Sequence, residues 1–217
     1  RGFLQRAVKR LAQDMGIRQF LDLGSGMPTQ RNTHEVVAEV MPDGRVVYVD
    51  INPSVVARAR EILDGVDGTA AIEGDIRHAE TILSHPETKT LLDFTEPIGV
   101  LAVAVTHFLS DEDDPWGSIA RFMDAVPSGS YLVLSAITSD YQEETWRNTL
   151  ERAGRGYEAY PRGRADVERF FKELQIITPY EGGVPVVGHV GLWGADDPDL
   201  ADDDSARLAY AAVARKP

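Results

Sequence analysis

The sequence of 217 residues contains no cysteine, which excludes disulfide bonds, thiolate metal sites, iron–sulfur clusters and a cysteine nucleophile. It also lacks any run of about 18 apolar residues, the length that a membrane-spanning helix requires, so no membrane partner is expected. The chain begins at Arg1 with neither an initiator methionine nor a charged-then-apolar leader. We therefore expect a cytoplasmic protein that lacks an N-terminal segment of its full length.

Positive charge is also scarce, because 22 Lys and Arg residues face 35 Asp and Glu residues and the formal net charge is -13. Ten of the acidic residues lie in two runs without Lys or Arg, at positions 111–114 and 196–204. We interpret both runs as solvated loops. For the first run a charged cap before Pro115 is favoured over a divalent-metal site, so no metal is expected. Because a negative field repels phosphate, the charge argues against a nucleic-acid partner.

The remaining composition is that of an ordinary globular domain, with 43% hydrophobic residues, 26% charged residues and a mean hydropathy of -0.23. The sequence shows no internal repeat, low-complexity linker or break in composition. We therefore expect one domain over residues 1–217, and the oligomeric state is left open.

Short β-rich segments alternate with amphipathic helical segments, which predicts an α/β fold with a mainly parallel, doubly wound sheet. Strands are expected at residues 19–23, 45–49, 69–72, 98–105, 131–137, 176–177 and 208–214. Helices are expected at residues 3–15, 33–40, 53–63, 79–84, 115–125, 142–153 and 165–174. The pattern gives seven strands, with helices between the first five.

Sheets of this kind bind ligands at the carboxyl ends of their strands, where this sequence places glycines and carboxylates. The first strand leads into Gly24-Ser25-Gly26, where missing Cβ atoms let a ligand lie against the backbone. Asp50, 24 positions after Gly26, is placed to accept both hydroxyls of a ribose. Asp75 follows the third strand and is placed to accept from an adenine amino group. Tight turns and helix caps are the alternative interpretations, but together these residues predict an adenine nucleoside pocket.

The loop after the first strand separates two kinds of adenine cofactor. A dinucleotide fingerprint needs a third glycine and a helix that begins at the pyrophosphate, whereas here Thr29 stands in that place, preceded by Pro28. No helix can start before about Asn32. The loop is therefore poorly suited to a pyrophosphate and favours S-adenosylmethionine, which has no phosphate.

Several segments resemble a bacterial family of S-adenosylmethionine-dependent methyltransferases that was long catalogued as a domain of unknown function. The most specific match is the Gly-x-Pro-Thr loop of residues 26–29 with the Asn-x-His-Glu of residues 32–35. The other matching segments are residues 20–25, 46–50, 107–108, 111–115, 129–135 and 215–217. Pro28 departs from the general class I loop, which has a third glycine, and the family has a segment upstream of Arg1.

The resemblance implies the class I methyltransferase fold, a seven-stranded sheet of order 3-2-1-4-5-7-6 whose last strand is antiparallel. The expected reaction transfers the methyl group of S-adenosylmethionine to an O or N nucleophile of a small molecule. The cofactor-binding residues that we expect are Asp22, Gly24, Ser25, Gly26, Thr29, Asp50, Ile51, Asp75, Ile76, Val105 and Thr106. Two alternatives stay open: an NAD(P)-dependent oxidoreductase, and a non-catalytic regulatory protein that binds S-adenosylmethionine.

His107 follows the central strand and should face the transferred methyl group, which makes it the candidate catalytic base or substrate-positioning residue. A structural histidine is the alternative interpretation. His34 is expected in the first turn of a helix, with cofactor contact as the alternative. Four aromatic residues could line an acceptor pocket or pack in the core: Tyr141, Trp146, Tyr157 and Tyr160.

Overall fold

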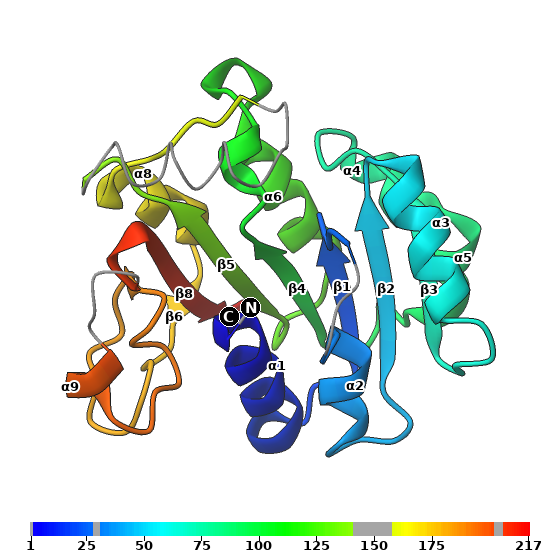
Figure 1. The fold of residues 1–217 in the computed structure, drawn as a ribbon, viewed down its shortest axis with the longest axis horizontal. Coiled ribbons are helices and arrows are strands. Elements are labelled where there is room, and N and C mark those ends of the chain that lie inside the picture. Colours follow the sequence, from blue (N-terminus) through cyan, green and yellow to red (C-terminus); the bar gives the residue numbers. More distant parts are fainter. Residues whose placement is uncertain (1, 28–30, 141–157, 202–205) are drawn as a thin grey trace.

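The computed structural model describes residues 2–27, 31–140, 158–201 and 206–217, and its centre is a twisted sheet (Figure 1). The strand order is β3-β2-β1-β4-β5-β8-β6, and the short β7 also pairs with β8. The strands are β1 (Gln19–Leu23), β2 (Arg45–Asp50), β3 (Thr69–Glu73), β4 (Ile98–Val103), β5 (Tyr131–Ile137), β6 (Gln175–Ile176), β7 (Gly188–His189) and β8 (Ala209–Arg215).

The first five strands run parallel, and β8 lies antiparallel to β5, β6 and β7. The predicted strand order and antiparallel last strand are therefore confirmed. The described residues form eight strands rather than the expected seven. The additional strand is β7, which has only two residues and lies in the segment that was expected to be a loop.

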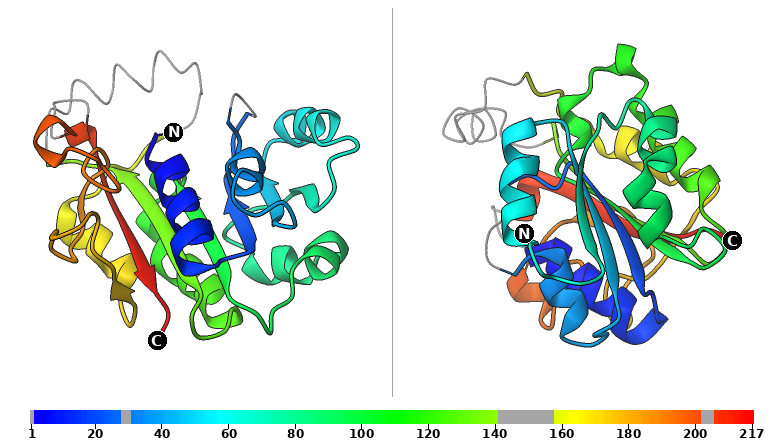
Figure 2. Two further views of the ribbon diagram at one scale, coloured as in Figure 1. Left: turned by 90° about the horizontal axis from the view of Figure 1, so that it is seen from below. Right: turned by 90° about the vertical axis from the view of Figure 1, so that its right-hand side faces the viewer.

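Helices cover both faces of the sheet, as the right-hand view of Figure 2 shows. The α-helices are α1 (Gly2–Met15), α2 (Thr33–Ala38), α3 (Pro53–Ile62), α4 (Ala79–Ser84), α5 (Pro86–Leu91), α6 (Pro115–Ala125), α8 (Arg164–Glu168) and α9 (Pro198–Ala201). The 3-10 helices are η1 (Thr106–Phe108), η2 (Asp111–Asp113), η3 (Arg169–Phe171) and η4 (Ala206–Leu208).

Successive residues of the strands enter two different hydrophobic cores, one on each face of the sheet. Phe20 of β1 packs with α1, α2 and α3, whereas its neighbour Leu21 packs with α4, α6 and α8. Val46 and Val47 of β2 divide in the same way. Because both faces are buried, the inner strands are apolar at nearly every position, and this is why the sequence predicted them well.

Several element boundaries differ from expectation. β4 ends at Val103 rather than at residue 105, because Ala104 has a left-handed φ of 57° that turns the chain towards η1. The helix expected at 165–174 is divided into α8 and η3. The helix α5 was not predicted, although Pro86 occupies its first turn, where proline is well tolerated. The helix expected at 142–153 lies outside the described residues.

In the part of the chain that the structure describes, no helix has the length and apolar character needed to cross a membrane.

Candidate cofactor site

A cavity of about 420 Å³ lies at the carboxyl ends of β1, β2, β3 and β4, the edge at which doubly wound sheets bind ligands. Its lining includes seven of the residues that the sequence analysis selected: Gly24, Gly26, Asp50, Ile51, Asp75, Ile76 and Val105. The lining also includes Met27, Asn52, Val55, Gly74, Arg77, Ala104, Phe108 and Leu109. The fold thus brings the ends of four strands into one cavity.

The other selected residues lie elsewhere. Asp22 and Ser25 line a smaller pocket that Gly26 also borders, on the side of α2. Thr106 and His107 are buried, and neither is among the described residues that line these two pockets. Thr29 lies outside the described residues.

The turn after β1 requires glycine for two physical reasons. Gly24 and Gly26 have φ values of 65° and 68°, in the left-handed region that is costly for a residue with a Cβ atom. In addition, a Cβ atom on Gly24 would lie 2.2 Å from Cγ2 of Val105. The turn after β1 therefore packs directly against the residue that follows β4, and both line the cavity.

Asp50 holds the turn after β1 and the start of α3. Its Oδ2 accepts the backbone N–H of Gly26 at 2.8 Å, and its Oδ1 accepts the backbone N–H of Asn52 at 2.9 Å. Asn52 in turn caps α3 by accepting the N–H of Ser54. A carboxylate has about four lone-pair sites, so about two remain for a ligand. Asp50 thus joins the turn after β1 to the residue that caps α3, and it still faces the cavity.

Asp75 forms an ion pair with Arg77, a residue that sequence reasoning missed. Its Oδ1 accepts the backbone N–H of Arg77 at 2.9 Å, and the Nε of the same arginine lies 2.9 Å from Oδ2. Burial of the Asp75 carboxyl opposes ionisation, but the hydrogen bonds and charge of Arg77 outweigh it and lower the pKa of Asp75. Hydrogen bonds to Asp75 and Asp113 raise the pKa of Arg77.

The segment after β4 is held by Arg162, a second residue that sequence reasoning missed. The Arg162 side chain is 4% exposed and donates to the carbonyl oxygens of Thr106 at 2.9 Å and Leu109 at 2.8 Å. It also pairs with Asp111 at 2.9 Å. Because residues 105, 108 and 109 line the cavity, Arg162 fixes this wall from behind.

His107 lies in η1 and is 2% exposed. Its Nδ1 lies 3.5 Å from the backbone N–H of Ile137, a long contact, and its carbonyl oxygen accepts the N–H of Tyr160 at 2.7 Å. The ring centroids of His107 and Phe108 are 4.4 Å apart. The imidazole is therefore packed against the end of β5, whereas Phe108 lines the cavity.

A polar network joins β1, β2 and α2 beside the cavity. The Thr33 hydroxyl donates to Oδ2 of buried Asp22 at 2.7 Å, and the backbone N–H of His34 donates to the Tyr48 hydroxyl at 2.8 Å. Burial of the tyrosine and the charge of Asp22 raise the pKa of Tyr48. Burial lowers the pKa of His34, although the charge of Glu35 opposes this shift. As expected, His34 lies in the first turn of a helix.

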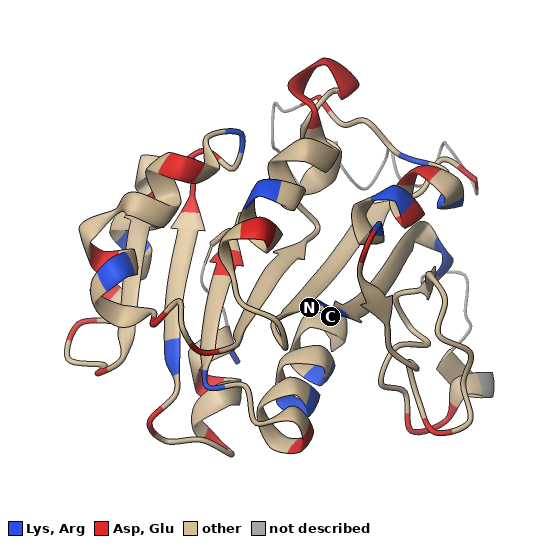
Figure 3. Cartoon of the chain, turned by 180° about the vertical axis from the view of Figure 1, so that it is seen from behind, with Lys and Arg blue, Asp and Glu red and all other residues tan. Residues whose placement is uncertain are grey.

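The acidic run at 111–114 forms the exposed loop above α6, which Figure 3 shows in red. Asp114 accepts the N–H of Gly117, so the expected cap of the following helix is confirmed. The expected solvated loop is confirmed, since Asp111 and Asp114 are 74% and 61% exposed. The sequence did not predict its ion pairs: Asp111 pairs with Arg162 and Asp113 with Arg77, 51 and 36 positions away. Among the described residues, no group of three or more His, Asp or Glu side chains could hold a metal ion.

The strand order and the antiparallel β8 define the class I methyltransferase fold, which is Rossmann-like, and the cavity lies at the carboxyl ends of β1 to β4. The chain belongs to the S-adenosyl methyltransferase family, whose model matches residues 1–217. It is an S-adenosylmethionine-dependent methyltransferase, as the sequence resemblance implied.

Solved structures agree with this assignment. A DUF574 family protein from Streptomyces avermitilis MA-4680 is 38% identical, with a TM-score of 0.88 over 100% of this chain and 82% of its own. A candidate methyltransferase from Thermobifida fusca YX is 35% identical, with a TM-score of 0.87 over 99% of this chain and 79% of its own. The N-methyltransferase NodS from Bradyrhizobium japonicum WM9 shares the fold. It is 15% identical, with a TM-score of 0.57 over 98% of this chain and 85% of its own. No match is found among curated proteins.

Proposed function

We propose that this chain binds S-adenosylmethionine in the 420 Å³ cavity and transfers its methyl group to an O or N nucleophile of a small molecule. The observation that carries the proposal is the meeting of the Gly24–Gly26 turn with the carboxylates of Asp50 and Asp75 in one cavity. The net charge of -13 supports a small acceptor rather than a nucleic acid.

Each part of the cofactor has a matching group in this proposal. The lone-pair sites left on Asp50 accept the ribose hydroxyls, and Asp75 accepts from the adenine amino group. Ile51, which is 51% exposed at the cavity, covers the adenine with apolar surface. Asp22 and Ser25, in the adjoining pocket, hold the methionine end. The cofactor contact of Thr29, which lies outside the described residues, stays a prediction from the sequence. Val105 forms the wall beside the sulfur, and buried Thr106, whose carbonyl oxygen accepts from Arg162, supports that wall from behind.

Methyl transfer from S-adenosylmethionine depends mainly on how the cofactor and the acceptor are positioned. When bound, S-adenosylmethionine supplies a methyl group on a sulfonium, which is already a good leaving group. Holding an acceptor in line with the S–C bond therefore supplies most of the rate enhancement. General-base help is needed mainly for an acceptor hydroxyl of high pKa, because a neutral amine or an already ionised hydroxyl attacks through a free lone pair.

The first experiment tests the cofactor by calorimetry with S-adenosylhomocysteine and NAD. We expect S-adenosylhomocysteine to bind and NAD to bind much more weakly, because among the described residues the first helix after the turn that follows β1 is α2, which starts only at Thr33. Binding of NAD in preference to S-adenosylhomocysteine would favour the oxidoreductase. Transfer of a radiolabelled methyl group to a metabolite extract then tests for catalysis, and binding without transfer would favour the regulatory alternative.

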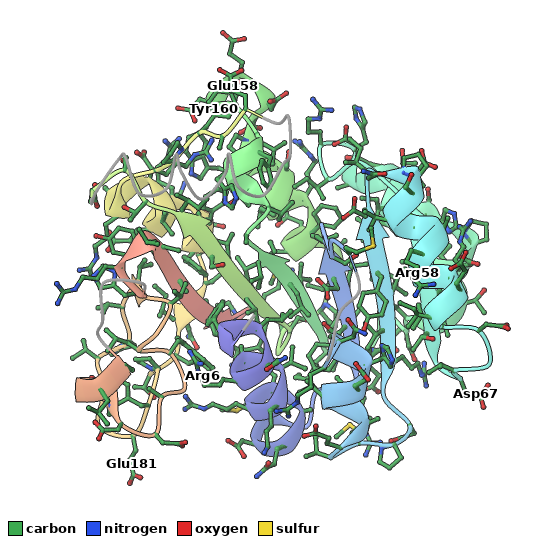
Figure 4. All side chains as sticks on the ribbon, viewed as in Figure 1. Arg6, Arg58, Asp67, Glu158, Tyr160 and Glu181 are labelled. Carbon is green, nitrogen blue, oxygen red and sulfur yellow. The ribbon has the colours of Figure 1, made fainter. Side chains whose placement is uncertain are left out.

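Asp50→Ala tests the ribose contact. Loss of two charge-assisted hydrogen bonds should weaken S-adenosylhomocysteine at least about tenfold. The melting temperature should also fall, because Gly26 and Asn52 lose their acceptor. Asp67→Ala, at an exposed position in the turn after α3, is the matched control (Figure 4). Equal affinity of the two variants would restrict Asp50 to a structural role.

We keep His107 as the proposed base or positioning residue. Its burial against β5 favours positioning, because a base must reach the acceptor. If it is a base, His107→Ala should slow transfer by about 10²–10⁴-fold with cofactor affinity unchanged. If it only positions η1, the variant should lose stability, rate and cofactor affinity together.

A further inference from the structure

Arg77 connects two walls of the cofactor cavity that come from strands that are not neighbours. Asp75 and Arg77 follow β3, whereas residues 108–109 follow β4, and β2 and β1 lie between these strands in the sheet. Nevertheless, Nη1 of Arg77 lies 3.2 Å from Oδ1 of Asp113, which follows the cavity-lining Leu109 within the same loop. The guanidinium therefore spans the rim of the cavity.

On the β4 side, Ser110 holds the Asp113 carboxylate in place independently of Arg77. Oδ2 of Asp113 accepts both the hydroxyl of Ser110 at 2.8 Å and its backbone N–H at 2.9 Å. These bonds close the first turn of η2, directly after Leu109. Ser110 and Arg77 lower the pKa of Asp113, so the carboxylate stays ionised as a partner for Arg77.

On the β3 side, the Asp75 carboxylate that Arg77 contacts can accept one further hydrogen bond. Arg77 offers three N–H groups to the Asp75 carboxylate: its backbone N–H, Nε–H and Nη2–H. A carboxylate has about four lone-pair sites, so about one remains for the amino group of an adenine. Because Arg77 binds the Asp75 carboxylate through several hydrogen bonds, it also fixes the direction of the remaining lone-pair site.

We propose that Arg77 is a positioning residue that closes the rim of the cavity through Asp113 and aims Asp75 at the amino group of adenine. The proposal rests on the proposed function, because it requires an adenine nucleoside in the cavity. It makes Arg77 a determinant of base specificity. Hypoxanthine carries a carbonyl oxygen in place of the amino group, and a fixed carboxylate rejects it through repulsion and an unmade hydrogen bond.

The test measures the affinities of S-adenosylhomocysteine and S-inosylhomocysteine by calorimetry in the wild type and in Arg77→Met. We expect the variant to bind S-adenosylhomocysteine about threefold to tenfold more weakly, as for loss of a partly exposed ion pair. Its preference for adenine over hypoxanthine should fall as well. The matched control is Arg58→Met, which removes another exposed arginine that pairs with an acidic residue, on α3 away from the cavity lining (Figure 4).

A double-mutant cycle shows whether Arg77 acts through Asp75. In an Asp75→Asn background, Arg77→Met should have little further effect on the base preference. Asp113→Asn should reproduce part of the loss of affinity and leave the preference nearly intact. Arg77→Lys, which keeps the charge but not the forked geometry, should lose the preference with little effect on folding.

Unchanged or tighter binding of S-adenosylhomocysteine by Arg77→Met would overturn the proposal, and tighter binding would mean that Arg77 competes with adenine for Asp75. The proposal would also be overturned if Arg77→Met changed the preference for adenine over hypoxanthine equally in the wild type and in Asp75→Asn. If the wild type fails to bind S-adenosylhomocysteine, the proposed function fails with it. If the wild type binds and the Arg77 variants behave like Arg58→Met, only this inference fails.

Discussion

At the scale of single residues, two backbone positions shape the turns that follow the neighbouring strands β1 and β4 at the cavity. Gly24 has a left-handed φ of 65° and approaches Val105, and Ala104 adopts a φ of 57° although it carries a Cβ atom. A non-glycine residue in that region usually costs about 1 kcal/mol or more. Such a conformation persists only where the surroundings enforce it, which here is the edge of the cavity.

Gly24→Ala should therefore destabilise the protein more than an ordinary glycine substitution. The variant combines the strain of a positive φ with a contact of 2.2 Å between its Cβ atom and Val105. We expect a loss of about 2–4 kcal/mol in the free energy of unfolding, together with weaker cofactor binding. Gly65→Ala is the matched control, because Gly65 has a φ of 76° but a Cβ atom there would meet nothing within 4 Å. Equal losses in urea unfolding would contradict the close-approach argument.

Arg162 gives a second prediction at this scale. Arg162→Met leaves the buried carbonyl oxygen of Leu109 without its side-chain donor, whereas that of Thr106 keeps the N–H of Leu109. We therefore expect a loss of about 1–3 kcal/mol in the free energy of unfolding. Asp111→Asn removes the partner that is 74% exposed and should cost less than about 1 kcal/mol. Chemical denaturation measures both. Similar losses for the two variants would mean that the ion pair, rather than the carbonyl contacts, holds this wall.

The sequence predicted one kind of site residue and missed another. Gly24, Asp50 and Asp75 follow strands directly, so the order of elements alone places them at one edge of the sheet. Arg77 and Arg162 are recognisable as site residues only from partners distant in sequence, the Asp113 carboxylate for Arg77 and the carbonyl oxygens of Thr106 and Leu109 for Arg162. No local pattern marks such contacts, because they depend on how loops from different strands meet.

At the scale of elements, strand and helix positions followed from hydrophobic periodicity, whereas ends depended on single backbone angles. β1, α4, α6 and β5 have the bounds that were expected. β4 stops early because of the φ of Ala104, and α8 gives way to η3. Such ends reflect tertiary packing around the cavity and the loops, which periodicity does not encode.

The contact between α2 and β2 makes stability depend on pH. Burial holds the pKa of His34 below its ordinary value of 6.5, and its Nδ1 lies 2.8 Å from the Tyr48 hydroxyl. A neutral ring can accept that hydroxyl proton, whereas a protonated ring cannot. Because the folded pKa is depressed, this stabilisation is complete above 6.5 and is lost as pH falls through the lower, folded pKa.

We therefore expect the midpoint of urea unfolding to fall as pH decreases from about 7 to about 5, in the range where histidine titrates. His34→Gln should remove part of that decrease. His78→Gln, at an exposed histidine before α4, is the control and should keep it. The same pH profile for wild type and His34→Gln would show that other groups cause the effect.

At the scale of the whole molecule, α1 ties the beginning of the chain to the segment between β6 and β8. Arg6 donates to the carbonyl oxygens of Trp193 at 2.7 Å and Val190 at 2.9 Å, and Arg10 donates to that of Thr178 at 2.7 Å. The Arg10 guanidinium also lies 5.3 Å from the centre of the Trp193 ring. Two side chains of one helix thus supply hydrogen-bond donors to backbone carbonyl oxygens in the connection between β6 and β8.

Arg6→Met tests this connection (Figure 4). It removes the donors of carbonyl oxygens in a partly buried region, so the free energy of unfolding should fall by about 1–3 kcal/mol. Lys9→Met, on the exposed side of the same helix, should change it by less than about 0.5 kcal/mol. Urea unfolding should show a lower midpoint with an unchanged slope, because the surface area exposed on unfolding stays the same. Affinity for S-adenosylhomocysteine should be unaffected, since neither residue lines the cavity. A normal midpoint with weakened binding would instead mean that α1 acts on the cofactor site.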